Sequence, residues 1–208
     1  AGLDSMLAVD LSWSMMALDR GRAGERVSRF DIARDVLEDF IRKRENDRLG
    51  LVVFSAVPYL ASPLTLNHDW LIEHLRRLYV GRLQELGTAI GDAIALSAKR
   101  LKEIPESRSR VIILLTDGDN NKGEIDPLPA AQLAAALGAR VYTIGIGIDQ
   151  PCHLPKFDPS TGELILDANG NVSLNAVTVG KIADKEVGVL RIFDLKMIYA
   201  LLKLWQDA

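Results

Sequence analysis

The chain has 208 residues, with 48% hydrophobic and 25% charged side chains and a formal net charge of −3. This size and composition indicate one soluble globular domain whose core is large enough to fold without disulfides or a structural metal. The acidic balance disfavours nucleic-acid binding. The single cysteine excludes an internal disulfide, and no apolar run of about 18 residues occurs that would predict a membrane-spanning helix.

The first predicted element is a buried apolar strand at residues 4–11, followed by a polar segment rich in Arg and Gly at residues 19–27. Ser28 has the features of a helix N-cap, because Asp31 stands three residues later, as in a capping box. Apolar residues then recur at helical spacing over residues 30–41 and predict a helix with one apolar face.

Strands and helices continue to alternate along the chain. Further strands are predicted at residues 49–54, 57–61, 110–116, 140–146 and 190–193, and helices at residues 69–79, 88–101, 127–137, 175–187 and from residue 195 onward. Pro58 favours an antiparallel edge position for its strand. The alternation implies right-handed crossovers, and hence an α/β fold: a doubly wound, mostly parallel six-stranded sheet with one antiparallel edge strand and helices on both faces.

Residues 151–173 interrupt this pattern with two turn clusters between short strands. We expect a β-hairpin insertion there, within a single domain that covers residues 1–208. The insertion is either a partner-binding element or a tolerated surface decoration. Cys152 and His153 have no second Cys or nearby His, so we expect a loop pair and no metal site.

Oxygen-bearing side chains follow two of the predicted strands. Asp10, Ser12 and Ser14 stand at alternate positions where the first strand ends, and Asp117 follows the strand at residues 110–116. In an open α/β sheet, ligands bind outside the carboxyl ends of the strands, where strand order reverses. These side chains therefore converge if the two strands are neighbours. A further oxygen would come from Thr88, at the start of a predicted helix.

Carboxylate and hydroxyl oxygens suit Mg²⁺, and also Mn²⁺ or Ca²⁺, and disfavour Zn²⁺, which prefers His or Cys. Neutral hydroxyl ligands leave such a cation with unbalanced charge. The cation therefore keeps a position that attracts a carboxylate from outside. This is binding chemistry, and it requires neither a nucleophile nor a general base.

The motif Asp10-x-Ser12-x-Ser14, with Thr88 and Asp117, resembles the metal-ion-dependent adhesion site (MIDAS) of von Willebrand factor type A (VWA) domains. The resemblance covers nearly the whole chain outside the expected hairpin. It implies a Rossmann-like VWA fold in which the residues matching these five hold a divalent metal, some of them through water. It also implies that an Asp or Glu of a protein partner completes the metal shell.

Several segments resemble bacterial membrane-anchored VWA proteins of the aerotolerance (Bat) type, namely residues 46–54, 63–66, 87–94 and 141–147. This resemblance implies a piece of a longer protein, tethered to the bacterial cytoplasmic membrane by flanking helices outside this chain and facing the periplasm. It also implies that the longer protein acts together with other VWA proteins and a MoxR-type AAA+ ATPase.

Trp13 departs from the pattern, because these bacterial relatives usually have Gly between the two serines. Its ring is either an interface hot spot or folds over neighbours such as Met15 or Met16. Asp92 lies one helical turn after Thr88. It either holds a water or orients a metal ligand, or is an ordinary solvated carboxylate.

The leading hypothesis is a non-enzymatic, divalent-metal-dependent protein-interaction module. The alternative is a Mg²⁺-dependent phosphohydrolase of the haloacid-dehalogenase type, with Asp10 beside the metal and Asp117 and Asp119 as accessories. That class normally needs a second Asp two positions after the first as general acid. Ser12 stands there and has no titratable group. The sequence has neither a phosphate-binding P-loop nor a complete dinucleotide fingerprint.

Overall fold

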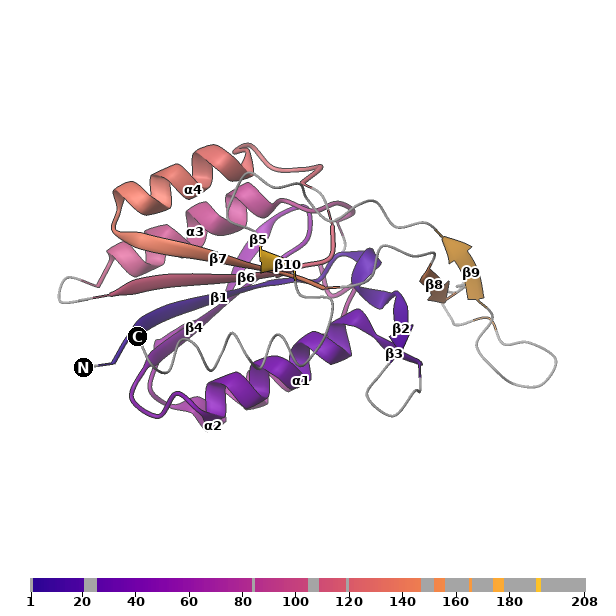
Figure 1. Cartoon of the computed structure of the whole chain (residues 1–208), viewed down its shortest axis with the longest axis horizontal. Coiled ribbons are helices and arrows are strands. Elements are labelled where there is room, and N and C mark those ends of the chain that lie inside the picture. Colours follow the sequence, from indigo (N-terminus) through magenta and orange to yellow (C-terminus); the bar gives the residue numbers. More distant parts are fainter. Residues whose placement is uncertain are drawn as a thin grey trace.

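The computed structural model describes residues 2–20, 26–83, 85–104, 109–118, 120–146, 152–155, 165, 174–177 and 190–191. A six-stranded sheet with the order β10-β7-β6-β1-β4-β5 lies between two layers of helices (Figure 1). The strands are β1 (Asp4–Asp10), β4 (Arg48–Phe54), β5 (Pro58–Thr65), β6 (Arg110–Thr116), β7 (Ala139–Gly145) and β10 (Leu190–Arg191).

All neighbouring strands in this sheet run parallel except β4 and β5, so the predicted sheet with one antiparallel edge strand is confirmed. β1 lies at the centre, between β4 and β6. The chain leaves β1 toward β4 and later returns to β6 on the other side. Strand order therefore reverses between β1 and β6, and ligands of such sheets bind beside that reversal.

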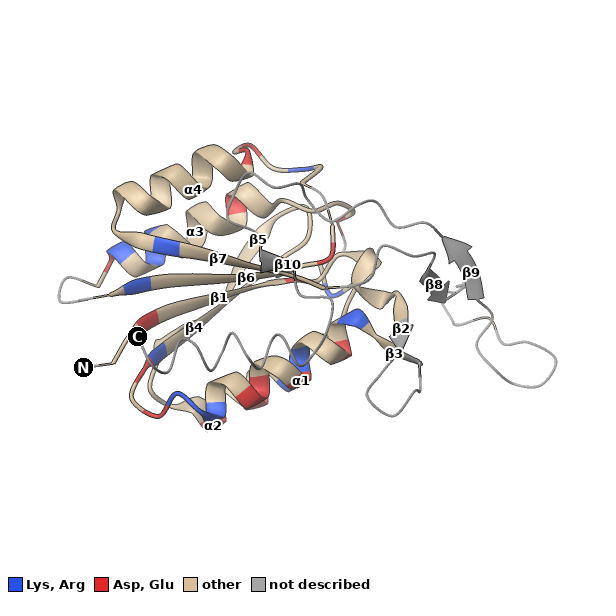
Figure 2. Cartoon of the chain, viewed as in Figure 1, with Lys and Arg blue, Asp and Glu red and all other residues tan. Residues whose placement is uncertain are grey.

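Helices α1 (Arg29–Arg42) and α2 (His68–Arg76) cover one face of the sheet, and α3 (Ile90–Lys102) and α4 (Pro127–Ala136) cover the other (Figure 1). Alternate residues of β1 face the two layers. Leu7 and Val9 belong to the core cluster with α1 and α2, and Met6 and Ala8 to the cluster with α3 and α4. Figure 2 shows charged residues on α1, α2 and α3 and at strand ends, while the middle stretches of β1 and β6 carry none.

The predicted start of α1 is confirmed in detail. The Asp31 N–H donates to Ser28 Oγ at 3.0 Å, and Ser28 Oγ donates to Asp31 Oδ2 at 2.6 Å. Asp126 is likewise the N-cap of α4. Some predicted boundaries were wrong: α2 ends at Arg76, before residue 79, α3 begins at Ile90, and β5 extends to Thr65, beyond the expected end at residue 61.

A second, four-stranded sheet has the order β3-β2-β8-β9 and lies beside η1, a 3₁₀ helix at Trp13–Met16. Its strands are β2 (Leu18–Arg20), β3 (Arg26–Ser28), β8 (Cys152–Pro155) and β9 (Leu174–Val177). All the strand pairs in this sheet are antiparallel. This sheet was not predicted, because pairings such as Leu18 with His153 join residues far apart in the sequence.

Two further expectations were wrong. Cys152 and His153 lie in a strand and not in a loop, and residues 175–177 form part of β9 in place of a helix start. Most of the expected hairpin lies outside the described residues, as do residues 178–187 of the expected helix and the expected helix after residue 195. Within the described part of the chain, no helix is long and apolar enough to cross a membrane.

Candidate metal site

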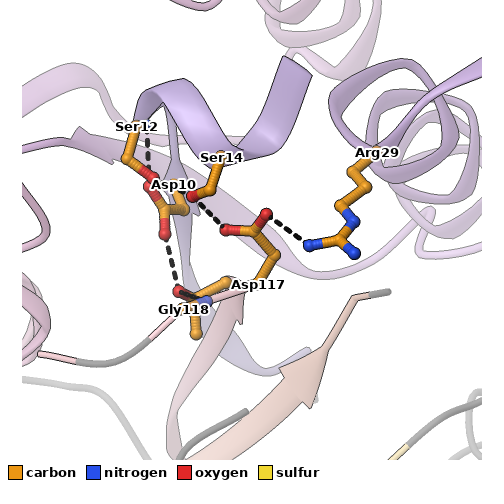
Figure 3. Close-up of polar contacts among 7 residues, drawn as sticks. Asp10, Ser12, Ser14, Arg29, Asp117 and Gly118 are labelled. Atoms are coloured by element: carbon orange, nitrogen blue, oxygen red, sulfur yellow. Dashed lines mark hydrogen bonds and ion pairs between the residues drawn. The ribbon is translucent and has the colours of Figure 1, made fainter. Parts of the chain in front are cut away.

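Asp10 is the last residue of β1 and is completely buried. Its Oδ1 accepts the Ser12 N–H at 2.8 Å (Figure 3). Its Oδ2 accepts the Thr116 hydroxyl at 2.6 Å. Burial, followed by the nearby charge of Asp117, raises the pKa of Asp10 to about 7 although these donors act in the opposite direction. Asp10 is thus a buried carboxylate that binds a proton at near-neutral pH when no cation is beside it.

Ser12 and Ser14 flank Trp13 at the start of η1. Their hydroxyl oxygens lie 3.0 Å apart, and Ser14 Oγ donates to Asp117 Oδ1 at 2.6 Å. Ser12 Oγ makes no capping hydrogen bond to η1, so capping does not account for this hydroxyl. The two serines instead form a side-chain network that runs from the end of β1 to the end of β6.

Asp117 directly follows β6 and is buried. Its Oδ2 accepts a hydrogen bond from Arg29 Nη1 at 2.9 Å, and the Arg29 side chain is only 3% exposed (Figure 3). Burial raises the pKa of Asp117, against the hydrogen bonds from Ser14 and Arg29. This buried ion pair supplies one positive charge to a site that holds two carboxylates.

Sequence reasoning missed Arg29, although the sequence contains a signal for it. Arg29 stands four residues before Ala33 and eight before Leu37, both buried on the apolar face of α1. A charged side chain on the buried face of a helix requires a buried partner of opposite charge.

Thr88 lies at the same edge of the sheet as the other candidate ligands. The N–H of the next residue, Ala89, donates at 2.7 Å to the carbonyl of Ser55, which follows β4 beside β1. Thr88 is 4% exposed and precedes Ala89, the N-cap of α3, so it is not itself the cap. Among the described residues, no hydrogen bond joins the Thr88 hydroxyl to the other four side chains.

The loop after β6 holds Thr88 in place through two asparagines that sequence reasoning did not use. Asn121 Oδ1 accepts the Thr88 N–H at 2.8 Å, and the Asn121 N–H donates to the Thr88 carbonyl at 3.0 Å. Asn120 Oδ1 accepts the N–H of Ile90 at 2.8 Å, in the first turn of α3.

Asp92 has a structural role that neither open interpretation anticipated. Its carboxylate accepts the N–H groups of Glu124 and Ile125 at 3.1 and 2.9 Å. The Asp92 carboxylate therefore holds the loop after β6 against α3.

The family model of the von Willebrand factor type A domain matches residues 5–120, more than half of the chain. The chain belongs to the VWA family. Among solved structures, an aerotolerance-related membrane protein from Bacteroides fragilis is 25% identical with a TM-score of 0.74, covering 99% of this chain and 98% of that one. BatB from Bacteroides thetaiotaomicron is 24% identical with a TM-score of 0.73 and the same coverage. This VWA domain therefore resembles Bat-type proteins, as the sequence predicted.

Curated relatives of the VWA domain are longer than this chain. An uncharacterised protein of Borreliella burgdorferi is 33% identical over 147 residues, which span 71% of this chain and 41% of that protein. A UPF0353 protein of Mycolicibacterium paratuberculosis is 33% identical over 150 residues, spanning 68% of this chain and 44% of that protein. The chain thus spans less than half the length of these relatives.

VWA domains are generally non-enzymatic modules that interact with proteins, and they commonly bind a divalent metal at a MIDAS. One solved structure with this fold, proximal thread matrix protein 1 of the mussel byssus, has a zinc-occupied MIDAS motif. It is 19% identical with a TM-score of 0.64, and it covers 98% of this chain and 47% of that one.

The chemistry of this VWA domain's donors fits a hard divalent cation. The site offers two buried carboxylates and the serine hydroxyls, all oxygen donors of the kind that Mg²⁺ and Ca²⁺ prefer. Asp10 and Asp117 both have raised pKa values, so the site favours added positive charge. Within the described residues, no three His, Cys, Asp or Glu side chains cluster to hold a metal, so hydroxyls and water would complete the coordination.

Proposed function

We propose that this VWA domain is a divalent-metal-dependent protein-interaction module. Asp10, Ser12, Ser14, Thr88 and Asp117 would hold Mg²⁺, or Mn²⁺ or Ca²⁺, and an Asp or Glu of a partner protein would complete the shell. The observation that supports this most is the pair of buried carboxylates, linked through the Ser12 N–H and the two serine hydroxyls, at the point where strand order reverses.

Charge accounts for the preference for an acidic partner. Ionised Asp10 and Asp117 bring two negative charges, and Arg29 already neutralises part of the charge on Asp117. A divalent cation held by these groups and by neutral hydroxyls keeps a net positive charge, which favours a carboxylate from outside. The chain's own residues bind and orient the cation, and none of them is required to transfer a proton.

The phosphohydrolase alternative gains no support from the described site. Its general-acid position is Ser12, whose hydroxyl lies 3.0 Å from Ser14 Oγ within the network. A serine there cannot exchange a proton near neutral pH.

The setting of the domain is proposed from its similarity to Bat-type proteins. We propose that residues 1–208 form one domain, with an insertion around residues 151–173. In the parent protein this domain would face the periplasm from the bacterial cytoplasmic membrane. It would work there with other VWA proteins and a MoxR-type AAA+ ATPase.

The function is tested by affinity capture from bacterial membranes with Mg²⁺ or with EDTA, using wild type and Asp10→Ala. Capture of a defined partner should require Mg²⁺ and should be lost in the variant. Asp35→Ala is the matched control, because Asp35 is an exposed carboxylate on α1. Undiminished capture by folded Asp10→Ala, or in EDTA, would contradict the proposal.

A further inference from the structure

Trp13 stands between two candidate metal ligands and remains accessible. It begins η1, and its side chain is 42% exposed, whereas Met15 in the same helix is completely buried. A large apolar ring therefore reaches the surface within one residue of both Ser12 and Ser14.

The Trp13 ring also lies beside the loop after α2. It lies against Gly81, where an added Cβ would sit 3.4 Å from Trp13 Cζ2 and 3.5 Å from Cη2. Gly81 has a φ of +86°, a conformation that side chains other than glycine rarely adopt. The loop after α2 thus supports one part of the ring and leaves the rest exposed. A ring that lies against a neighbouring loop loses less conformational entropy on binding than one surrounded by solvent.

Two more exposed apolar side chains occur in the same loop region. Tyr79 is 60% exposed and stands two residues before Gly81, and Leu86 is 68% exposed and stands two residues before Thr88. The segment that leads from α2 to the candidate ligand Thr88 therefore presents apolar surface at both of its ends.

We propose that Trp13 is a specificity-determining residue, and this inference rests on the proposed function. It selects a partner segment in which the Asp or Glu stands next to a large apolar side chain. The carboxylate engages the metal site, and its apolar neighbour covers the exposed part of the ring. Because Trp side chains at interface hot spots carry much of the binding energy, replacing Trp13 by Ala should weaken such a segment about 10- to 30-fold.

The test uses arrays of immobilised hexapeptides of equal net charge, each with one Glu. In one set the Glu is flanked by Leu or Phe, and in the other set it is flanked by Ser. Wild type in Mg²⁺ should prefer the apolar neighbours. Trp13→Ala should bind both sets equally, and Trp13→Phe should keep the preference. Trp70→Ala is the matched control, because Trp70 is 39% exposed and lies on α2. Circular dichroism confirms that each variant is folded.

The outcomes separate the two proposals. Equal binding of both peptide sets by wild type, or an unchanged preference in Trp13→Ala, overturns the role of Trp13 and leaves the metal-dependent function standing. Binding that persists in EDTA or in Asp10→Ala, or no Mg²⁺-dependent binding of any acidic peptide, overturns the proposed function and this inference with it.

Discussion

At the scale of single residues, the main feature of the site is a pair of carboxylates whose burial disfavours their ionised forms. Asp10 and Asp117 are both buried, and the Arg29 guanidinium contacts only Asp117 of the two in the described contacts. Asp10 depends on two uncharged donors, the Ser12 N–H and the Thr116 hydroxyl. The two acids therefore respond differently to pH and to substitution.

Asp10→Asn should stabilise the metal-free domain at high pH. Between the unfolded pKa of 3.8 and the folded value of about 7, the folded domain retains a proton that the unfolded chain releases. Stability therefore falls as pH rises through this window. In urea unfolding with EDTA, the variant should exceed wild type by roughly 2–4 kcal/mol at pH 8, because a tenfold change in proton affinity corresponds to ~1.4 kcal/mol. The difference should nearly vanish at pH 4, and a less stable variant at pH 8 would contradict this account.

Arg29→Met should destabilise the metal-free domain, because it leaves the buried Asp117 charge without its cation. Breaking a buried ion pair by removing one partner typically costs about 3–5 kcal/mol. Excess Mg²⁺ should recover more stability in the variant than in wild type, since the metal supplies the missing positive charge. Arg34→Met is the control: Arg34 pairs with Asp31 at the surface, and such pairs contribute at most about 1 kcal/mol. Equal Mg²⁺ stabilisation of wild type and Arg29→Met in thermal unfolding would be evidence against this role.

At the scale of elements, the site is assembled by strand ends and fixed by a loop. The approach of Asp10, Ser12 and Ser14 to Asp117 could be predicted, because the carboxyl ends of parallel neighbours meet at one edge. The N-caps of α1 and α4 were also predictable, since capping depends on residues close in sequence.

The supporting contacts at this scale could not be predicted in the same way. Arg29, Asn120 and Asn121 each find a partner that only the packed fold brings near. The small second sheet escaped prediction for the same reason, because β2 pairs with β8 from a distant part of the chain.

The close packing of α3 on the loop after β6 predicts an unusual helix substitution. Gly91→Ala should destabilise the domain although alanine favours helices, because its Cβ would lie 1.8 Å from the Ile125 carbonyl oxygen. Overpacking of this kind typically costs about 1–3 kcal/mol. Lys99→Ala, at an exposed position of the same helix, should change stability by less than about 0.5 kcal/mol. Urea unfolding of both variants measures the difference, and a Gly91→Ala domain as stable as wild type would refute this packing argument.

At the scale of the whole molecule, both core clusters meet at β1, and the candidate site lies at its end. A ligand bound there contacts the element on which both layers pack. Binding at this edge should therefore stabilise the entire domain.

Mg²⁺ should raise the thermal unfolding temperature of wild type. Ligand binding to the folded state alone stabilises it by about 2.7 kcal/mol at a concentration 100 times the dissociation constant. Asp10→Ala should show no such rise, while Asp35→Ala should match wild type. A rise of equal size in all three proteins would indicate binding elsewhere, and no rise in wild type at any concentration would oppose a metal site.

The carboxylate oxygens of Asp10 and Asp117 already have hydrogen-bond partners within the domain. Asp10 accepts hydrogen bonds from Ser12 and Thr116, and Asp117 accepts them from Ser14 and Arg29, which makes four contacts in all. An arriving ion must therefore exchange these internal bonds for coordination bonds. Ion binding would accordingly be a substitution reaction, whose completeness depends on which group occupies the coordination position that the domain's own residues leave open. The amount of complex formed would then depend jointly on the cellular concentrations of the ion and of the partner.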